Sequence, residues 1–211
     1  MSYAVKELFF TLQGEGANTG RPSVFCRFAG CNLWSGLEAD RATAICTFCD
    51  TEFVGTDGDG GGRFASARDL AAAAKSKWPD GADVTPFLVC TGGEPLLQLD
   101  DDAIEAFHGA GFEVAVETNG TRVAPRGLDW VCVSPKAGAG LHQCKGDELK
   151  LVYPQAGAPP RDFEGLDFAH FFLQPMDGSA REHNTTLALG YCREHPQWQL
   201  SLQTHKYLGI R

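Results

Sequence analysis

Three cysteines in one loop constrain this chain more than any other feature of its sequence. Cys31 closes the run Arg27-Phe-Ala-Gly-Cys, and a polar detour that begins at Ser35 leads to the pair Cys46-Thr-Phe-Cys49. Fourteen residues separate the first two cysteines, and two separate the last two. Three thiolates can hold a cubane iron–sulfur cluster by three of its irons, whereas such clusters normally take four cysteines. The pattern therefore favours a cluster whose last iron accepts a ligand from elsewhere.

The same cysteines permit two simpler interpretations. A Cys-x-x-Cys pair with one further thiol is also a zinc pattern, for which His108 or His142 is a candidate fourth ligand. Cysteine is also often a small core residue with no ligand at all. The other five cysteines lie mostly within apolar stretches and fit this last interpretation: Cys26, Cys90, Cys132, Cys144 and Cys192. The loop by itself leaves the three interpretations open.

Length and charge limit what kind of protein this is. The 211 residues suffice for one substantial core, so we expect a single domain over residues 1–211. The net charge of −9 argues against a surface that follows nucleic-acid phosphates. There is no export-signal pattern and no apolar run long enough to span a bilayer, so we expect a cytoplasmic protein without a membrane partner.

Short apolar segments interleaved with a few helices predict the fold. Strands are expected at residues 23–29, 87–91, 112–117, 128–134, 148–153, 168–174 and 198–203. Helices are expected after the cap Ser66-x-x-Asp69 and around 99–107 and 180–192, and the glycine-rich run 55–62 is expected to be a flexible connection. A complete eight-fold barrel needs about 250 residues. We therefore expect the α/β class, as a partial, open TIM-like barrel with about six parallel strands and few helices.

Polar residues and glycines follow nearly every expected strand. In barrels the active site is built from the loops at the carboxyl ends of the strands. The endings here are Gly30-Cys31, Thr91-Gly-Gly-Glu-Pro95, Glu117-Thr-Asn-Gly120, Ser134-Pro-Lys136, Gln174-Pro-Met-Asp177 and Gln203-Thr-His205. Their convergence on one rim favours catalysis over a zinc staple. Arg27, between Phe25 and Ala29 on one strand face, is either a strand-edge ion pair or an anion-binding group inside a cavity, and we favour the cavity.

These motifs together resemble a known family. Gly30-Cys31, Cys46-x-Phe48-Cys49 and Gly92-Gly-Glu-Pro95 resemble the radical S-adenosylmethionine superfamily. With Gln13-Gly-Glu-Gly16, Glu117-Thr-Asn-Gly120, Ser134-Pro-Lys136 and Gln203-Thr-His-Lys206, the chain is similar to the 7-carboxy-7-deazaguanine synthase family from about Leu12 to its end. The usual superfamily spacing between the first two cysteines is much shorter than here, a departure also met in some members of this family. The domain would thus carry an extended cluster-binding loop at residues 32–45.

The resemblance implies a set of cofactors and the residues that hold them. Cys31, Cys46 and Cys49 would ligate a 4Fe-4S cluster, and Thr51 would be a magnesium ligand that leaves most positions to water or substrate. The S-adenosylmethionine pocket would be formed by Phe48, Cys49, Asp50, Gly92, Gly93, Glu94, Ser134, Pro135, Lys136, Gln174, Pro175, Met176 and Asp177. Gly92 to Glu94 would receive the methionine ammonium, with the glycines allowing close backbone approach. No side chain would be catalytic beyond the cluster and the cofactor.

The resemblance also implies the substrate and the reaction. The substrate would be 6-carboxy-5,6,7,8-tetrahydropterin, whose carboxylate offers the Arg27 guanidinium a planar partner. Substrate contacts would come from Leu12, Gln13, Gly14, Glu15, Arg27, Thr91, Glu117, His205 and Arg211. Reductive cleavage of S-adenosylmethionine, hydrogen removal from C6 of the pterin and ring contraction with loss of ammonia would give 7-carboxy-7-deazaguanine, on the route to queuosine and other 7-deazapurines. The implied partners are an electron donor such as flavodoxin or ferredoxin and a second copy of the chain in a homodimer.

Two other functions fit part of the sequence. A radical S-adenosylmethionine activating enzyme would act on a partner protein and would need a broad docking face, whereas Arg27, Gln13 and His205 indicate a small anionic ligand. A zinc-stapled binding module would not be an enzyme. Iron taken up on anaerobic reconstitution favours the enzymes, and a product assay with the carboxytetrahydropterin separates the synthase from the activating enzyme.

Overall fold

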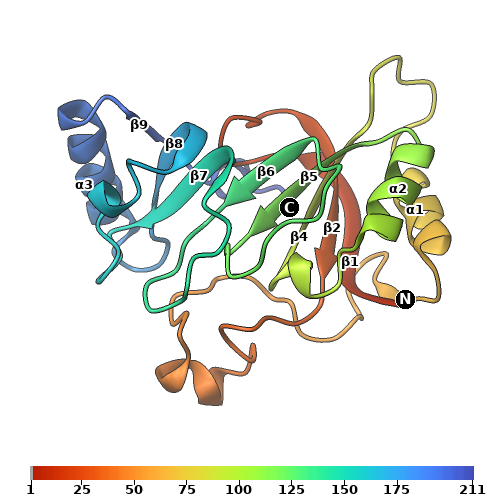
Figure 1. Cartoon of the computed structure of the whole chain (residues 1–211), viewed down its shortest axis with the longest axis horizontal. Helices are drawn as coiled ribbons and strands as arrows, with labels where there is room; N and C mark the ends of the chain where they lie inside the picture. Colours follow the sequence, from red (N-terminus) through yellow and green to blue (C-terminus); the bar gives the residue numbers. More distant parts are fainter. Residues whose placement is uncertain (1) are drawn as a thin grey trace.

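The computed structural model describes residues 2–211, which build one nine-stranded sheet with helices beside it (Figure 1). The strands are β1 (Tyr3–Leu12), β2 (Pro22–Phe28), β3 (Gly62–Phe64), β4 (Phe87–Gly92), β5 (Glu113–Thr118), β6 (Trp130–Val133), β7 (Lys145–Tyr153), β8 (Asp167–Pro175) and β9 (Trp198–Leu200). The helices are α1 (Ala67–Lys75), α2 (Asp101–Gly109), α3 (Arg181–Glu194) and α4 (Thr204–Leu208), with short 3-10 turns η1 (Glu38–Thr43), η2 (Pro95–Leu97) and η3 (Pro160–Asp162).

The sheet is an open barrel wall rather than a closed ring. Its strand order is β3-β1-β2-β4-β5-β6-β7-β8-β9, and β2 and all strands from β4 to β9 pair in parallel. Only β1 pairs antiparallel, with β2 on one side and β3 on the other. Within residues 2–211 the edge strands β3 and β9 do not meet. The predicted partial barrel is confirmed, with one more parallel strand than expected.

Two apolar clusters hold the helices against the sheet. Around β4, Leu88 and Cys90 are fully buried and pack in the cluster that includes the buried faces of α1 and α2. Around β7 and β8, Leu149 and Leu173 pack with Trp198 and the α3 residue Ala188. Figure 1 shows α1 and α2 together at one end of the sheet and α3 at the other. Because side chains alternate between the two faces of a strand, the opposite face is left to build a cavity.

The helix starts agree with the sequence, but the glycine-rich run does not behave as a free connection. The Ser66 hydroxyl accepts the Asp69 N–H and caps α1 as predicted. Between residues 55 and 62, Gly58 N–H donates to the Lys6 carbonyl (2.9 Å), and a Cβ at Gly61 would lie 2.2 Å from that oxygen. Glycine is therefore required where this run packs along β1. No helix among residues 2–211 has the length and apolarity to cross a membrane.

Candidate active site

A cavity of about 380 Å³ opens where the parallel strands end. Its walls come from segments far apart in the chain: the ends of β2, β4, β5 and β8, the cysteine loop, and the last residues of the chain. All predicted site residues except two line it: Leu12, Gln13, Gly14, Glu15, Arg27, Cys31, Cys46, Phe48, Cys49, Asp50, Thr51, Thr91, Gly92, Gly93, Glu117, Ser134, Lys136, Gln174, Pro175, Met176, Asp177, His205 and Arg211. The fold therefore brings the predicted set together at the carboxyl ends of the strands, where barrel enzymes place their sites.

Glu94 and Pro135 are the two residues that lie behind the wall. Glu94 is fully buried, and its carboxylate accepts hydrogen bonds from Thr118 Oγ1 (2.8 Å), Asn119 N (2.8 Å) and Leu96 N (2.9 Å). Burial raises the pKa of Glu94, which these donors oppose. Glu94 thus caps η2 and ties the end of β4 to the end of β5, and its predicted contact with a methionine ammonium stays a prediction.

The two glycines before Glu94 allow the end of β4 to lie directly against the end of β2. A Cβ at Gly93 would lie 2.2 Å from the Gly30 carbonyl oxygen and 2.8 Å from Cys31 Cβ. At Gly92, where φ is +145°, a Cβ would lie 2.2 Å from the Phe28 carbonyl oxygen. The two glycines allow the ends of β2 and β4 to touch, which places their backbone next to the first cysteine.

The long detour between Cys31 and Cys46 returns to its starting point. The Leu33 carbonyl accepts hydrogen bonds from both Ile45 N (3.1 Å) and Cys46 N (3.3 Å). The residues in between project away from the sheet and carry η1, drawn in orange in Figure 1. Because the two ends of the detour meet, Cys31 and Cys46 are brought toward each other although fourteen residues separate them in the sequence.

Arg41, which the sequence reasoning missed, fastens this detour to the cysteine pair. Its Nη1 donates to the carbonyls of Thr47 (3.1 Å) and Cys49 (3.0 Å). Its guanidinium lies 4.0 Å from the ring centroid of Trp34, at the other end of the detour. A planar cation that stacks on an aromatic ring and donates in its own plane suits both contacts. The available signal was a tryptophan just before the polar run and an arginine within it.

The three thiols line one wall and interact electrostatically. A hydrogen bond from the Cys46 thiol lowers the pKa of Cys49 to about 6, although burial opposes the shift. Burial raises the pKa of Cys31. Among residues 2–211 no three His, Cys, Asp or Glu side chains converge tightly enough to hold one metal ion. A cubane takes its cysteines at separate corners, and three thiols that line one cavity are compatible with that arrangement.

Two polar groups on the neighbouring walls also fit a polar cofactor. The Gln174 amide oxygen is buried without a hydrogen-bond partner among the described residues, although Gln174 lines the cavity. Buried polar atoms are normally paired, so this oxygen indicates a missing donor. The Lys136 ammonium donates to the carbonyl and hydroxyl oxygens of Ser134, both at 2.6 Å, and faces the same space.

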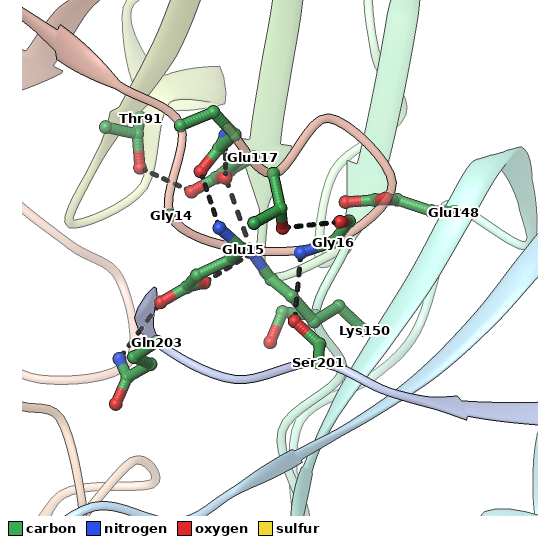
Figure 2. A network of polar contacts seen from close by, with 12 residues as sticks. Gly14, Glu15, Gly16, Thr91, Glu117, Glu148, Lys150, Ser201 and Gln203 are labelled. Atoms are coloured by element: carbon green, nitrogen blue, oxygen red, sulfur yellow. Dashed lines mark hydrogen bonds and ion pairs between the residues drawn. The ribbon is translucent and has the colours of Figure 1, made fainter. Parts of the chain in front are cut away.

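The other end of the cavity is a network of charged groups (Figure 2). Glu117 accepts hydrogen bonds from Gln13 (3.1 Å), Thr91 (3.3 Å) and the Lys150 ammonium (3.3 Å). Lys150 also bonds Glu15 at 2.6 Å. Burial raises the pKa of Glu15, but the Lys150 ammonium outweighs it and the net pKa is about 2. Lys150 thus secures the charge of Glu15 and also bonds Glu117, and this lysine was not predicted.

Arg27 satisfies both of the alternatives that the sequence left for it. Its Nε donates to Glu7 Oε1 (2.8 Å), so it is part of an ion pair, and it also lines the cavity. Glu7 Oε2 in turn accepts from Arg211 Nη2 (2.7 Å). No residue between 2 and 211 bonds the two terminal nitrogens of Arg27. Its guanidinium edge is thus available to a planar anion.

The end of the chain closes the cavity from above the loop 13–16. The Thr204 N–H and hydroxyl both donate to the Gly14 carbonyl, at 2.9 and 3.0 Å. The His205 ring lies so close that a Cβ at Gly14 would be 2.3 Å from its Nδ1. Lys206 forms ion pairs with Asp50 and Asp177. Helix α4 and these contacts of Lys206 were not predicted, because five residues carry too little periodicity to be seen.

An open α/β barrel with three loop thiols and a polar cavity at the carboxyl ends of its strands defines an enzyme of the radical S-adenosylmethionine class. No family model matches the chain. It is 64% identical over 210 residues to the 7-carboxy-7-deazaguanine synthase of Caulobacter vibrioides and 55% identical over 215 residues to that of Nitratidesulfovibrio vulgaris, with all of each chain covered. The crystal structure of QueE from Escherichia coli matches with a TM-score of 0.67 and 26% identity, covering 96% of this chain and 94% of that one.

This chain belongs to the 7-carboxy-7-deazaguanine synthase family. The predicted family and fold class are confirmed, and so is the enzyme class, a lyase. The same comparisons confirm the predicted cofactors as those of the family: a 4Fe-4S cluster, S-adenosylmethionine and magnesium. Family membership excludes the alternatives of an activating enzyme and a zinc-stapled module.

Proposed function

We propose that this cavity converts 6-carboxy-5,6,7,8-tetrahydropterin into 7-carboxy-7-deazaguanine with loss of ammonia. The observation that carries the assignment is the division of one 380 Å³ space into a wall of three thiols and a wall of fixed charged groups. A cofactor-dependent reaction on a small polar ring needs both, because the reactive group and the substrate must be held against each other. The step belongs to the biosynthesis of queuosine and other 7-deazapurines.

The thiol wall would hold the cluster and its cofactor. Cys31, Cys46 and Cys49 supply the three sulfur ligands, which leaves one iron for S-adenosylmethionine. When bound, the cluster and this cofactor supply the electron transfer and the radical that removes a hydrogen atom from the substrate. The chain's own task is placement: the buried Gln174 oxygen offers an acceptor, and Ser134 fixes the Lys136 ammonium beside it. The remaining cofactor contacts would come from Phe48, Asp50, Gly92, Gly93, Pro175, Met176 and Asp177, which line the same wall.

The charged wall would hold the pterin. Arg27 would bind the substrate carboxylate through its terminal nitrogens, since Glu7 occupies only Nε. Glu15 and Glu117 would accept hydrogen bonds from N–H groups of the ring, and Leu12, Gln13, Gly14 and Thr91 would surround its edge. His205 and Arg211 would exclude water from above, because the chain end is fastened to Gly14 and to Glu7. Thr51 lines the cavity between the two walls and would give magnesium one oxygen, with water and substrate completing its shell.

The partners and setting follow the same assignment. We infer an electron donor of the flavodoxin or ferredoxin type, because the cluster must be reduced in each turnover. We also infer a homodimer, a cytoplasmic location and a single domain over residues 1–211 with an extended cluster loop at 32–45. The continuous nine-stranded sheet supports the single domain, since all nine strands join one sheet and α1, α2 and α3 pack on it.

Anaerobic reconstitution tests the proposal directly. Purified protein supplied with iron and sulfide is expected to bind about four of each per chain and turn brown. With S-adenosylmethionine, magnesium, a reductant and the carboxytetrahydropterin, it is expected to release ammonia and 7-carboxy-7-deazaguanine, which mass spectrometry detects. A reconstituted protein that cleaves S-adenosylmethionine but leaves this pterin unchanged would overturn the substrate, and one unable to bind iron would overturn the whole assignment.

A further inference from the structure

Lys150 stands behind the two carboxylates that face the substrate space. It lies on β7 between Leu149 and Leu151, which point into the core on the opposite face. Its side chain is 5% exposed, whereas those of Glu15 and Glu117 are 14% and 21% exposed. A ligand in the cavity would therefore meet mainly the carboxylates, and the ammonium would act on the ligand through them.

The four polar side chains in this corner form a closed ring, which Figure 2 shows in part. Lys150 joins Glu15 (2.6 Å) to Glu117 (3.3 Å), and Gln13 Nε2 donates to Glu117 (3.1 Å). The Glu15 N–H closes the ring by donating to Gln13 Oε1 (3.1 Å). Of these four residues, Lys150 is the one whose charged ammonium bonds both carboxylates. Its removal would therefore leave two partly buried carboxylates beside each other with no cation between them.

Donors from other elements hold the outer oxygens of the same carboxylates. Gln203 Nε2 bonds Glu15 Oε1 (2.9 Å), and Thr91 Oγ1 bonds Glu117 Oε2 (3.3 Å). Each carboxylate is thus fixed at both oxygens, yet two oxygens offer about four lone-pair sites, so each can accept a further N–H. A pair of acceptors fixed in this way costs little reorganisation when a ligand arrives.

The loop that carries Gln13 and Glu15 is itself pinned from below. The Ala17 N–H donates to Glu148 Oε2 (2.8 Å), and the Gly16 N–H donates to Ser201 Oγ (2.9 Å), as Figure 2 shows for Gly16. Gly16 has φ +66°, and a Cβ there would lie 2.4 Å from the Glu148 carboxylate. The backbone of the loop is therefore held independently of Lys150. Replacing the lysine should alter the carboxylates without releasing the loop.

We propose that Lys150 is a positioning residue of this reaction: it holds Glu15 and Glu117 in place as an oriented pair of acceptors for the ring N–H groups of the reduced pterin. The inference rests on the proposed function for its ligand. A tetrahydropterin carries N–H donors on both of its rings, and a pair of anionic acceptors suits such an edge. The shared cation offsets the repulsion between the two neighbouring carboxylates.

The surroundings indicate a role through charge and not through proton transfer. Burial favours the neutral amine of Lys150, but the acidic groups around it, among them Glu117, Glu15 and Glu148, raise its pKa well above the ordinary lysine value. An ammonium that keeps its proton at neutral pH is a poor general acid. Other titratable groups also face this corner. They are Cys132 on β6, Lys136 after β6, His205 on α4 and Asp50 in the cysteine loop.

Binding of the substrate to cluster-loaded enzyme tests the role. Anaerobic calorimetry is expected to give Lys150→Met a Kd for 6-carboxy-5,6,7,8-tetrahydropterin raised roughly tenfold to a hundredfold, because one partner of a buried charge network is lost. Lys150→Arg, which keeps the charge, should lose clearly less. The Kd for S-adenosylmethionine should stay within about twofold in both, since its wall makes no contact with Lys150. Arg21→Met, which removes a half-buried paired cation outside the cavity, is the matched control and should bind the pterin normally.

The pH dependence distinguishes positioning from a structural role. In the wild type the pKa of Glu15 is about 2, so its charge is complete throughout neutral pH. Without the ammonium, burial dominates and the pKa rises, so Lys150→Met should bind the pterin more tightly as the pH increases from about 6 to 9, relative to the wild type. If Lys150→Met does not fold, Lys150→Met combined with Glu117→Gln removes one charge of each sign and should show the same weakened binding.

Several outcomes would overturn the inference. These are an unchanged pterin Kd in Lys150→Met, equal losses in Lys150→Met and Lys150→Arg, or parallel losses for the pterin and S-adenosylmethionine. Failure of the proposed function looks different, because the wild-type enzyme would then neither bind this pterin nor release the deazaguanine acid.

Discussion

The two walls of the cavity are built by different means. The charged wall combines side chains of β2, β5 and β7 with those of the loop 13–16, and its members already bond one another, as Glu15 and Glu117 do through Lys150. The thiol wall stands on a loop with no strand residue between 31 and 51, and among residues 2–211 a single hydrogen bond, between Cys46 and Cys49, joins its thiols. One half of the site is thus organised by the protein alone. The other half needs the cluster to complete it, as is usual where metal binding and local folding are coupled.

The hydrogen bond between Cys46 and Cys49 illustrates the difference. It lowers the pKa of Cys49 to about 6 and raises the pKa of Cys46, so the proton between the two sulfurs belongs mainly to Cys46. Cluster ligation takes thiolates, so both sulfurs must lose their protons and the bond between them must give way. The carboxylates of the charged wall need no such change before a ligand arrives. Substitutions in the two walls should therefore differ in the size of their effect and in the property that they change.

The largest effect is expected at the thiol wall. Cys49→Ala removes one of three sulfur ligands, so iron retention should fall severely and product formation should drop below detection, although the fold remains. Iron and sulfide analysis with an anaerobic product assay measures both. Cys144→Ala changes an exposed cysteine outside the cavity and should match the wild type. Normal turnover by Cys49→Ala would end the three-thiol assignment.

A smaller effect is expected from Arg27 on the charged wall. Arg27→Ala removes the guanidinium edge proposed for the substrate carboxylate, so KM for the pterin should rise about tenfold to a hundredfold. Cleavage of S-adenosylmethionine in the absence of the pterin should change little, because the thiol wall is untouched. Steady-state kinetics with the separate cleavage assay distinguishes the two. An unchanged KM would remove Arg27 from the substrate contacts, and a loss of cleavage would show that the walls are not independent.

Arg41 gives an intermediate case within the loop itself. Arg41→Met removes the bonds to the carbonyls of Thr47 and Cys49 but spares every thiol. The cluster should still form, yet it should be lost several times faster to a chelator, since the hydrogen bonds of a half-buried cation contribute about 1 to 3 kcal/mol. Absorbance decay with a chelator measures the rate, and Arg63→Met, on an exposed strand position outside the cavity, is the control. Equal decay rates would mean that the cluster alone shapes the loop.

The sequence predicted those features that depend on neighbouring residues. The strand at 87–91 could be recognised from its own apolar residues, and the motifs after the strands fell on one rim because parallel strands end at one edge. Lys150 was missed because its partner Glu15 lies 135 positions away in the chain, and no local pattern reports such a pair. The hydrogen bonds of Glu94 with Thr118 and Asn119 were not predicted, because a motif gives the residue type but not the direction of its side chain.

The smallest predicted effect concerns Lys206, which joins the two walls. Its ammonium bonds Asp177 (2.6 Å) after β8 and also Asp50 in the cysteine loop, and all three side chains are partly exposed. Exposed pairs contribute little, so Lys206→Met should lower the free energy of unfolding by only about 1 kcal/mol at pH 7. Denaturant unfolding measures this difference, and Lys77→Met, which loses one long surface pair with Asp59, is the control.

The pH dependence gives this last prediction its sign. The hydrogen bond from Lys206 is the main cause that lowers the pKa of Asp177, so the pair contributes its stability above the ordinary aspartate pKa of about 3.9 and loses it as the pH falls through the lower folded-state pKa. The wild type and Lys206→Met should therefore differ at neutral pH and converge in acid. If they differ equally at pH 7 and about pH 2.5, the effect comes from packing of the lysine stem and not from its charge. A difference in the free energy of unfolding well above about 1 kcal/mol would instead mean that the thiol wall depends on the chain end for its position. The two walls would then be more alike than we propose.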